Sequence, residues 1–236
     1  MKKTIVFLLI LFALGLSCEK PNGPNGDNIP DEIDRALWPF NTGSFWEFDV
    51  WEMTSEGEFN YFEKYAVLNI IAHDGNRVAK IEFTQYLEDT TFGRFVMWWG
   101  NTLDGLYEFA PFGEVFNPHD APRLLFLFPA EDMDAFGSYA FDFQDPITMT
   151  YFDIGIPPFD LPAGRFDECV GYNLSRHVMP DPPENNYYYF KPDTGYVRFE
   201  KYITGSGLVK TRSLRDFLVQ DRLSQLKEIR HGRQSR

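Results

Sequence analysis

Residues 59–87 read FNYFEKYAVLNIIAHDGNRVAKIEFTQYL. Two runs rich in aromatic and β-branched residues, 59–72 and 77–87, flank the turn Asp74-Gly75-Asn76. Side chains of these types pack well on the pleated surface of a sheet. A glycine between two such runs tolerates the positive φ that a tight turn needs, which is a hairpin signal. This stretch therefore predicts two antiparallel strands.

The same pattern continues on both sides of the hairpin. Apolar and aromatic runs alternate with turn residues, prolines lie between the runs, and no long helical pattern occurs. We therefore expect a mostly β fold, with a curved antiparallel sheet, half-barrel or sandwich of about 10 strands in a single domain. A short helix is expected over 222–229, after the last strand. The further strand-like runs are 45–53, 94–99, 106–109, 124–128, 139–143, 147–154, 166–177, 187–190, 195–204 and 208–219.

The chain begins with the pattern of a secretory signal. Lys2 and Lys3 precede an apolar run over 5–16, which ends at Ser17-Cys18. A helix over this run would be roughly 18 Å long. The hydrocarbon core of a bilayer is about 30 Å thick. We therefore favour a cleaved signal over an uncleaved membrane anchor.

Residues 14–18 (LGLSC) resemble the lipobox of bacterial lipoproteins, in which the cysteine is lipidated and becomes the mature N-terminus. Ser17 fits the small residue before the cysteine, whereas Gly15 departs from the usual leucine. The resemblance implies acyl chains, palmitate among them, on Cys18, so that the membrane itself is a partner of the protein. Glu19 is not the aspartate associated with inner-membrane retention. The expected location is the cell envelope, with the outer membrane preferred.

Four regions follow from these patterns. Residues 1–17 are the signal peptide, and 18–36 hold the lipidated cysteine and a flexible tether. The tether is expected because 19–28 contains no apolar residue. Residues 37–222 form the β-rich domain, and 223–236 form a basic C-terminal tail.

Composition excludes one class of partner. The chain has 22 Lys and Arg against 35 Asp and Glu, a net charge of −13. Such a chain repels the phosphates that dominate nucleic-acid affinity, so nucleic-acid binding is excluded for the domain. Cys169 is the second of two cysteines. We predict that it is buried, because free cysteine packs as a small apolar residue and Asp167 and Glu168 disfavour a thiolate.

The sequence carries no catalytic, cofactor or metal signature. The acidic clusters at 31–34 and 131–134 lack the ordered positions of a calcium loop. Hydrolase and phosphate-binding motifs are absent, although a triad assembled from distant residues would leave no motif. His73 and His119 are expected as solvated loop residues. No pair with metal-ligand spacing occurs among the four histidines, which are His73, His119, His177 and His231.

Aromatic residues supply the candidate binding site. Two runs place aromatic side chains on both faces of a strand, so one face serves the core and the other can line a groove for a lipid, a glycan or another stacking ligand. The alternative is packing against a second layer of structure. The candidate ligand-binding residues are Trp98, Trp99, Tyr187, Tyr188 and Tyr189.

Three landmarks resemble a loosely defined group of uncharacterised bacterial envelope lipoproteins. They are 39–48 (PFNTGSFWEF, with its G-x-x-W), 161–170 (LPAGRFDECV, with its P-A-G-x-F-x-x-C) and 188–198 (YYFKPDTGYVR, with its Y-F-x-P-x-x-G-x-V). The third departs from the group, because 191–195 replaces a tighter turn. The resemblance implies a curved antiparallel sheet, such as a half-barrel like those of envelope lipid carriers. It implies no enzymatic activity and supplies no catalytic residues.

Three functional hypotheses follow. The first is a non-enzymatic binding or carrier module for an apolar or aromatic-stacking ligand or an envelope protein. The second is a glycan-acting hydrolase of the periplasm or cell surface, which requires two carboxyl groups facing each other across a polar cleft. The third is a structural component of an envelope assembly, which requires a flat apolar patch and no pocket.

Overall fold

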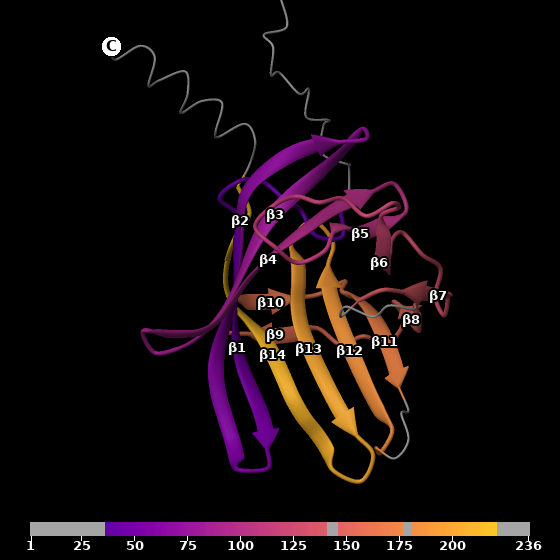
Figure 1. Ribbon diagram of the computed structural model, residues 1–236. Coiled ribbons are helices and arrows are strands. Elements are labelled where there is room, and N and C mark those ends of the chain that lie inside the picture. Colours follow the sequence, from indigo (N-terminus) through magenta and orange to yellow (C-terminus); the bar gives the residue numbers. More distant parts are fainter. Residues whose placement is uncertain (1–35, 141–145, 177–180, 221–236) are drawn as a thin grey trace, which may run out of the picture.

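The computed structural model describes residues 36–140, 146–176 and 181–220. These residues confirm the expected mostly β, single-domain fold with a curved antiparallel sheet (Figure 1). Twelve strands form one sheet, and β9 and β10 form a separate two-stranded sheet. The strands are β1 Phe45–Thr54, β2 Gly57–His73, β3 Asn76–Leu87, β4 Thr90–Thr102, β5 Gly105–Ala110, β6 Arg123–Leu127, β7 Ala135–Ser138, β8 Ile147–Phe152, β9 Phe159–Leu161, β10 Gly164–Phe166, β11 Val170–Arg176, β12 Glu184–Lys191, β13 Gly195–Ile203 and β14 Gly207–Leu218.

The predicted hairpin is the longest pair in the sheet. β2 and β3 pair antiparallel from Phe62↔Tyr86 to His73↔Asn76. The turn residues Asp74 and Gly75 have φ values of 48° and 75°. Positive φ at both central residues matches the right-handed twist of the flanking strands, as in type I′ hairpins.

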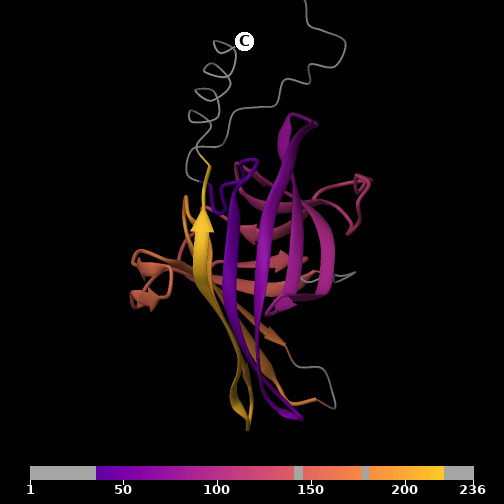
Figure 2. The same ribbon diagram turned by 90° about the vertical axis from the view of Figure 1, so that its left-hand side faces the viewer.

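The sheet curves until its two ends meet. The first strand, β1, pairs with the last, β14, in the middle of the sheet (Figures 1 and 2), so β6 and β7 are the outer strands. The Tyr139 N–H donates to the Leu124 carbonyl at 2.8 Å, and Ser138 Oγ donates to the Leu125 carbonyl at 2.6 Å. These bonds join the two edges into a seam, so the sheet is a nearly closed barrel.

The core fills the inside of this curve. Trp46, Phe48 and Val50 alternate along β1 and are each at most 2% exposed. Alternation of this kind places every second side chain on one face of a strand. Trp38, which precedes the first strand, lies within 6 Å of six aromatic rings, centroid to centroid, including those of Trp46 and Tyr196. The chain before β1 therefore packs into the core.

The structure corrects two strand predictions. The strand expected over 139–143 does not include Tyr139 and Ala140, because β7 ends at Ser138, and residues 141–143 lie outside the described residues. The strand expected over 166–177 is divided into β10 and β11 by Glu168, whose φ is 50°. That left-handed conformation interrupts a strand. Cys169, directly after this break, is 5% exposed, and burial raises the pKa of its thiol to about 11, which confirms the predicted buried role.

Several predictions lie outside the described residues. These are the signal peptide, Cys18 with most of the tether, the helix over 222–229, the basic tail, and the residues His177 and His231. Within the described ranges, no helix has the length and apolarity needed to cross a membrane.

Candidate functional site

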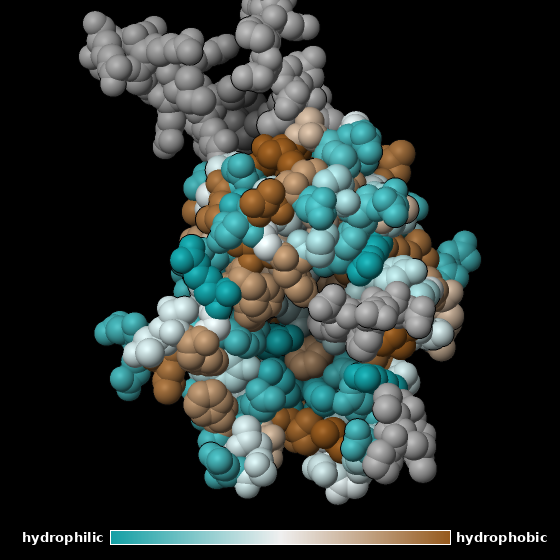
Figure 3. Space-filling view, viewed as in Figure 1, coloured by the Kyte–Doolittle hydropathy of each residue, from teal (hydrophilic) through white to brown (hydrophobic). Residues whose placement is uncertain are grey.

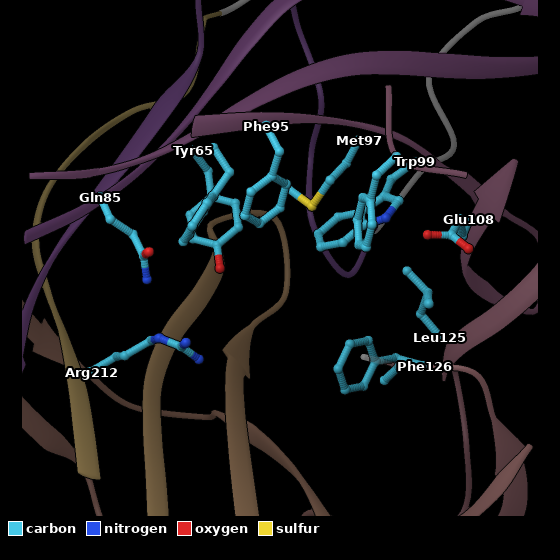
Figure 4. Close-up of a pocket in the computed structure, with 12 residues that line it drawn as sticks. Tyr65, Gln85, Phe95, Met97, Trp99, Glu108, Leu125, Phe126 and Arg212 are labelled. Atoms are coloured by element: carbon cyan, nitrogen blue, oxygen red, sulfur yellow. The ribbon is translucent and has the colours of Figure 1, made fainter. Parts of the chain in front are cut away.

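A cavity of about 230 Å³ lies inside the curved sheet. The face of the molecule in Figure 3 is hollowed near its middle, with hydrophobic residues above the hollow and mostly hydrophilic ones below it. Most of the residues lining the cavity are aromatic or aliphatic, and a few polar groups lie among them (Figure 4). The lining consists of Tyr65, Phe83, Gln85, Phe95, Met97, Trp99, Glu108, Phe112, Leu125, Phe126, Ala140 and Arg212.

The register of the sheet builds the aromatic wall. Tyr65 of β2 is opposite Phe83 of β3, which is opposite Phe95 of β4. Their ring centroids are 4.8 Å and 4.5 Å apart. Opposed side chains on one face of an antiparallel pair lie this close by geometry. Two of the rings near the opening remain exposed, because Phe95 and Phe112 are 40% and 42% accessible.

One end of the cavity is charged. The Nε of Arg212 lies 2.5 Å from Glu63 Oε2, and Arg212 Nη2 donates to Glu63 Oε1 at 3.3 Å. Gln85 Nε2 also donates to this oxygen, at 3.1 Å. The Glu63 side chain is fully buried and that of Arg212 is 16% exposed. Burial disfavours the charged guanidinium, but the Glu63 carboxylate outweighs it and raises the pKa of Arg212 above its ordinary value.

A second ion pair continues this polar end. Lys210 Nζ donates to Glu52 Oε2 at 2.8 Å and to the Tyr61 hydroxyl at 2.7 Å. Partial burial disfavours the ionised Glu52 carboxyl, but hydrogen bonding to Lys210 outweighs it, so the pKa of Glu52 is lowered. The Tyr61 hydroxyl also donates to Glu63 Oε1 at 3.3 Å, which links the two ion pairs. The inner face of β1, β2 and β14 therefore holds two acids, each neutralised by a base.

The opposite end of the cavity carries another acid. Glu108 Oε2 lies 3.1 Å from His119 Nε2 and 4.0 Å from Arg123 Nη1. Figure 4 places Glu108 across the cavity from Arg212. The side chain of His119 is 12% exposed. The expectation of a solvated His119 was therefore wrong. The loop folds back onto the sheet, and the backbone N–H of His119 donates to the Phe109 carbonyl.

The candidate aromatic residues are divided between the two faces of the sheet. Trp99 and Tyr188 point inward, since Trp99 lines the cavity and both residues line a smaller pocket beside it. Trp98 is buried in a separate outer cluster, and its Nε1 donates to the Gly113 carbonyl at 2.9 Å. Tyr189 packs against Phe159 of β9, at 4.8 Å between ring centroids. Here a second layer of structure covers the outer face.

Tyr187 also lies on the outer side, with its ring 5.8 Å from that of Tyr202. The structure therefore brings Trp99 and Tyr188 together and leaves Trp98, Tyr187 and Tyr189 elsewhere. Ligand binding by these residues stays a prediction.

Sequence reasoning missed the charged residues of the site. Glu63 stands between Tyr61 and Tyr65, in a run where every second side chain points inward. An acid at an inward position of such a run predicts a buried polar group, and this signal was available in the sequence. Its partner Arg212 is 149 residues further along the chain, so no local pattern indicates the pair. Within the described ranges, no group of three or more His, Cys, Asp or Glu side chains could hold a metal ion.

No protein family and no curated protein matches this sequence. Among solved structures, the chain is similar to a Bacteroides fragilis protein described as exported and as having a YmcC-like fold, with 14% identity and a TM-score of 0.46. It is also similar to a Parabacteroides distasonis protein described as a lipoprotein, with 15% identity and a TM-score of 0.45. Each similarity covers 79% of this chain and 100% of the other, and it concerns the fold alone.

Proposed function

We propose that this protein is an envelope lipoprotein, anchored in the outer membrane through Cys18, whose β domain binds the apolar or aromatic part of a ligand without chemical conversion. The observation that carries the proposal is the cavity of about 230 Å³ with its aromatic wall. A cavity of roughly 150 Å³ lined by apolar side chains accepts benzene, so this volume suffices for a ring or a short acyl chain.

The polar groups favour binding over hydrolysis. A glycosidase needs two carboxyl groups about 5–9.5 Å apart that flank the scissile bond. Here Glu63 is held by Arg212, and Glu108 lies beside His119 on the other side of the cavity. The cavity also disfavours the purely structural role, which requires a flat patch and no pocket.

Native mass spectrometry of the full chain, purified gently from its own envelope, tests this proposal. We expect a retained molecule of defined mass. In a Met97→Trp variant that molecule should be lost, because Met97 is 3% exposed and lines the cavity, so the added ring occupies the ligand volume. A matched control is Met53→Trp, on the 44% exposed Met53, which should retain the molecule.

A second filling variant, Leu125→Phe, repeats the test with a smaller change should Met97→Trp fold poorly. Proteins without any retained mass, or a mass retained equally by all variants, would contradict the proposal. Cys18→Ala tests the anchor separately. This variant should lose metabolic labelling with palmitate and should leave the membrane fraction.

A further inference from the structure

A smaller pocket of about 40 Å³ adjoins the cavity. The two share four wall residues, among them Trp99 and Arg212, so the pocket is a side chamber of the same interior. The full lining of this chamber consists of Trp38, Tyr65, Trp99, Phe126, Tyr188, Phe190, Tyr196 and Arg212.

Three polar groups of this lining are buried with no protein acceptor for their protons. They are Trp38 Nε1, Trp99 Nε1 and the Tyr196 hydroxyl. Trp38 and Tyr196 are 2% and 4% exposed. Buried polar groups in native proteins nearly always have a partner, and leaving one unsatisfied is costly. Three in one chamber therefore indicate that something else supplies their partners.

Most of the polar groups in this lining donate hydrogen bonds. An indole N–H only donates, and a guanidinium only donates. Burial raises the pKa of the Tyr196 hydroxyl, and the Arg212 guanidinium, which donates to this hydroxyl, offsets part of that rise. Because Arg212 has no acceptor to offer, the Tyr196 proton still needs one. The tyrosine hydroxyls of the lining both donate and accept, and the Arg212 charge is paired with Glu63, so the lining presents more donors than acceptors.

A bound water would satisfy these donors only in part. A chamber of about 40 Å³ is large enough for a water molecule, whose share of liquid volume is about 30 Å³. A water accepts hydrogen bonds but must also donate two, and in this wall only the tyrosine hydroxyls can accept its protons. A carboxylate only accepts, and its bonds to such donors are charge-assisted and about twice as strong as neutral ones.

We propose that the ligand is an amphipathic monocarboxylate, whose carboxylate accepts hydrogen bonds from Trp99, Tyr196 and Arg212. Its apolar part, an aromatic ring on a short link or an acyl chain of similar size, occupies the larger cavity. Figure 4 shows the Arg212 guanidinium directed toward the space below the aromatic wall. This inference rests on the proposed binding function and specifies its ligand class.

Three probes of one shape test the inference: 3-phenylpropionate, 3-phenyl-1-propanol and 3-phenylpropylamine. Each is titrated calorimetrically into the full chain carried in lipid nanodiscs, with empty discs as the blank. We expect the acid to bind at least about tenfold more tightly than the alcohol, and the amine to bind least. An amine that bound most tightly would place the head group at Glu108 and overturn the inference.

The decisive variant is Tyr196→Phe, which removes one donor and, within the protein, only the contact of its hydroxyl with Arg212. This variant should weaken binding of the acid about tenfold and binding of the alcohol by much less. Tyr107→Phe makes the same change outside both pockets, where it loses an exposed bond to Asp104, and should alter neither affinity. If acid and alcohol bind equally and Tyr196→Phe affects neither, the chamber holds water, the inference fails and the proposed function stands. If no probe binds and no molecule is retained from the envelope, both fail.

Discussion

Glu63 and Arg212 illustrate what a buried charge costs this fold. Both lie on the inner face of a sheet whose other inward residues are mostly aromatic or aliphatic. Removing two charges from water costs several kcal/mol each, and their mutual attraction offsets this only with good geometry. Gln85 and Tyr61 add hydrogen bonds to Oε1 of the Glu63 carboxylate. An apolar pair would serve the core as well, and of the two residues only Arg212 lines the cavity.

The first prediction concerns this pair. Arg212→Met should lower the free energy of unfolding by about 3–5 kcal/mol, because it leaves the fully buried Glu63 carboxylate without its cation. The double variant Glu63→Leu/Arg212→Met should recover most of that loss, since it removes both charges. Urea denaturation followed by tryptophan fluorescence measures both. A double variant no more stable than the single one would show that the pair contributes net stability.

The second prediction concerns acid stability. The folded-state pKa of Glu52 is lowered from 4.5, because the Lys210 bonds outweigh its desolvation. A lowered folded pKa means that the stabilisation is present above the unfolded pKa and is lost as pH falls through the folded one. Urea midpoints should therefore fall more steeply below about pH 4.5 for the wild type than for Glu52→Gln. The exposed Glu56→Gln serves as the control and should follow the wild type.

At the scale of the elements, the core restricts which residue the turn between β12 and β13 can hold. Gly195, the first residue of β13, has φ +104°, and a Cβ there would lie 2.3 Å from Trp38 Cδ1. The next turn offers a comparison, because Gly205 has φ +88° and nothing within 4 Å of its Cβ position. The two positions separate backbone strain from crowding.

The third prediction uses this contrast. Gly205→Ala should cost about 1–2 kcal/mol of stability through the left-handed backbone alone. Gly195→Ala should cost a further 1–3 kcal/mol or so, because the buried Trp38 must move. Thermal unfolding of the two variants, together with their tryptophan emission, measures the difference. Equal losses of stability in the two variants, with unchanged tryptophan emission, would mean that Trp38 accommodates the added methyl group without loss of stability.

Local patterns predicted the strands well where the signal was local. The hairpin of β2 and β3 and the strands β1, β8, β12, β13 and β14 lie close to their expected positions, because alternation and turn chemistry act over a few residues. The short strands β9 and β10 were not predicted as a pair, since three residues carry little periodicity. The break at Glu168 was missed because a non-glycine residue adopts a positive φ there.

The candidate site was less predictable, because it depends on the whole molecule. Neighbouring aromatic residues such as Trp98 and Trp99 point to opposite faces, and only the sheet order shows which face encloses the cavity. Arg212 reaches the site because the last strand pairs with the first. Neither fact follows from spacing along the chain. The aromatic content indicated a site of this kind, but its polar end required the closure of the sheet.

Closure also determines where the molecule opens. β6 and β7 are the outer strands of the sheet, whereas β1, β2 and β14 each have a partner on both sides. Ser138 is fully buried at the seam, where its Oγ donates to the Leu125 carbonyl at 2.6 Å and accepts from the Ala140 N–H at 3.0 Å. Leu125, Phe126 and Ala140 at this seam also line the cavity. Local opening here would expose the interior while the central strands stay paired.

The fourth prediction follows from this arrangement. Amides of β6 and β7 should exchange with deuterium faster than those of β1 and β2, and Ser138→Ala should accelerate them further. The reason is that the variant leaves a buried carbonyl and a buried N–H unpaired, at a cost of about 1–3 kcal/mol. Exchange read by mass spectrometry locates the effect. Ser213→Ala, on central strand β14, should leave the seam unchanged. Acceleration spread evenly over all strands would instead mean that the sheet opens as one unit, and that closure at Ser138 stabilises the whole molecule rather than its seam.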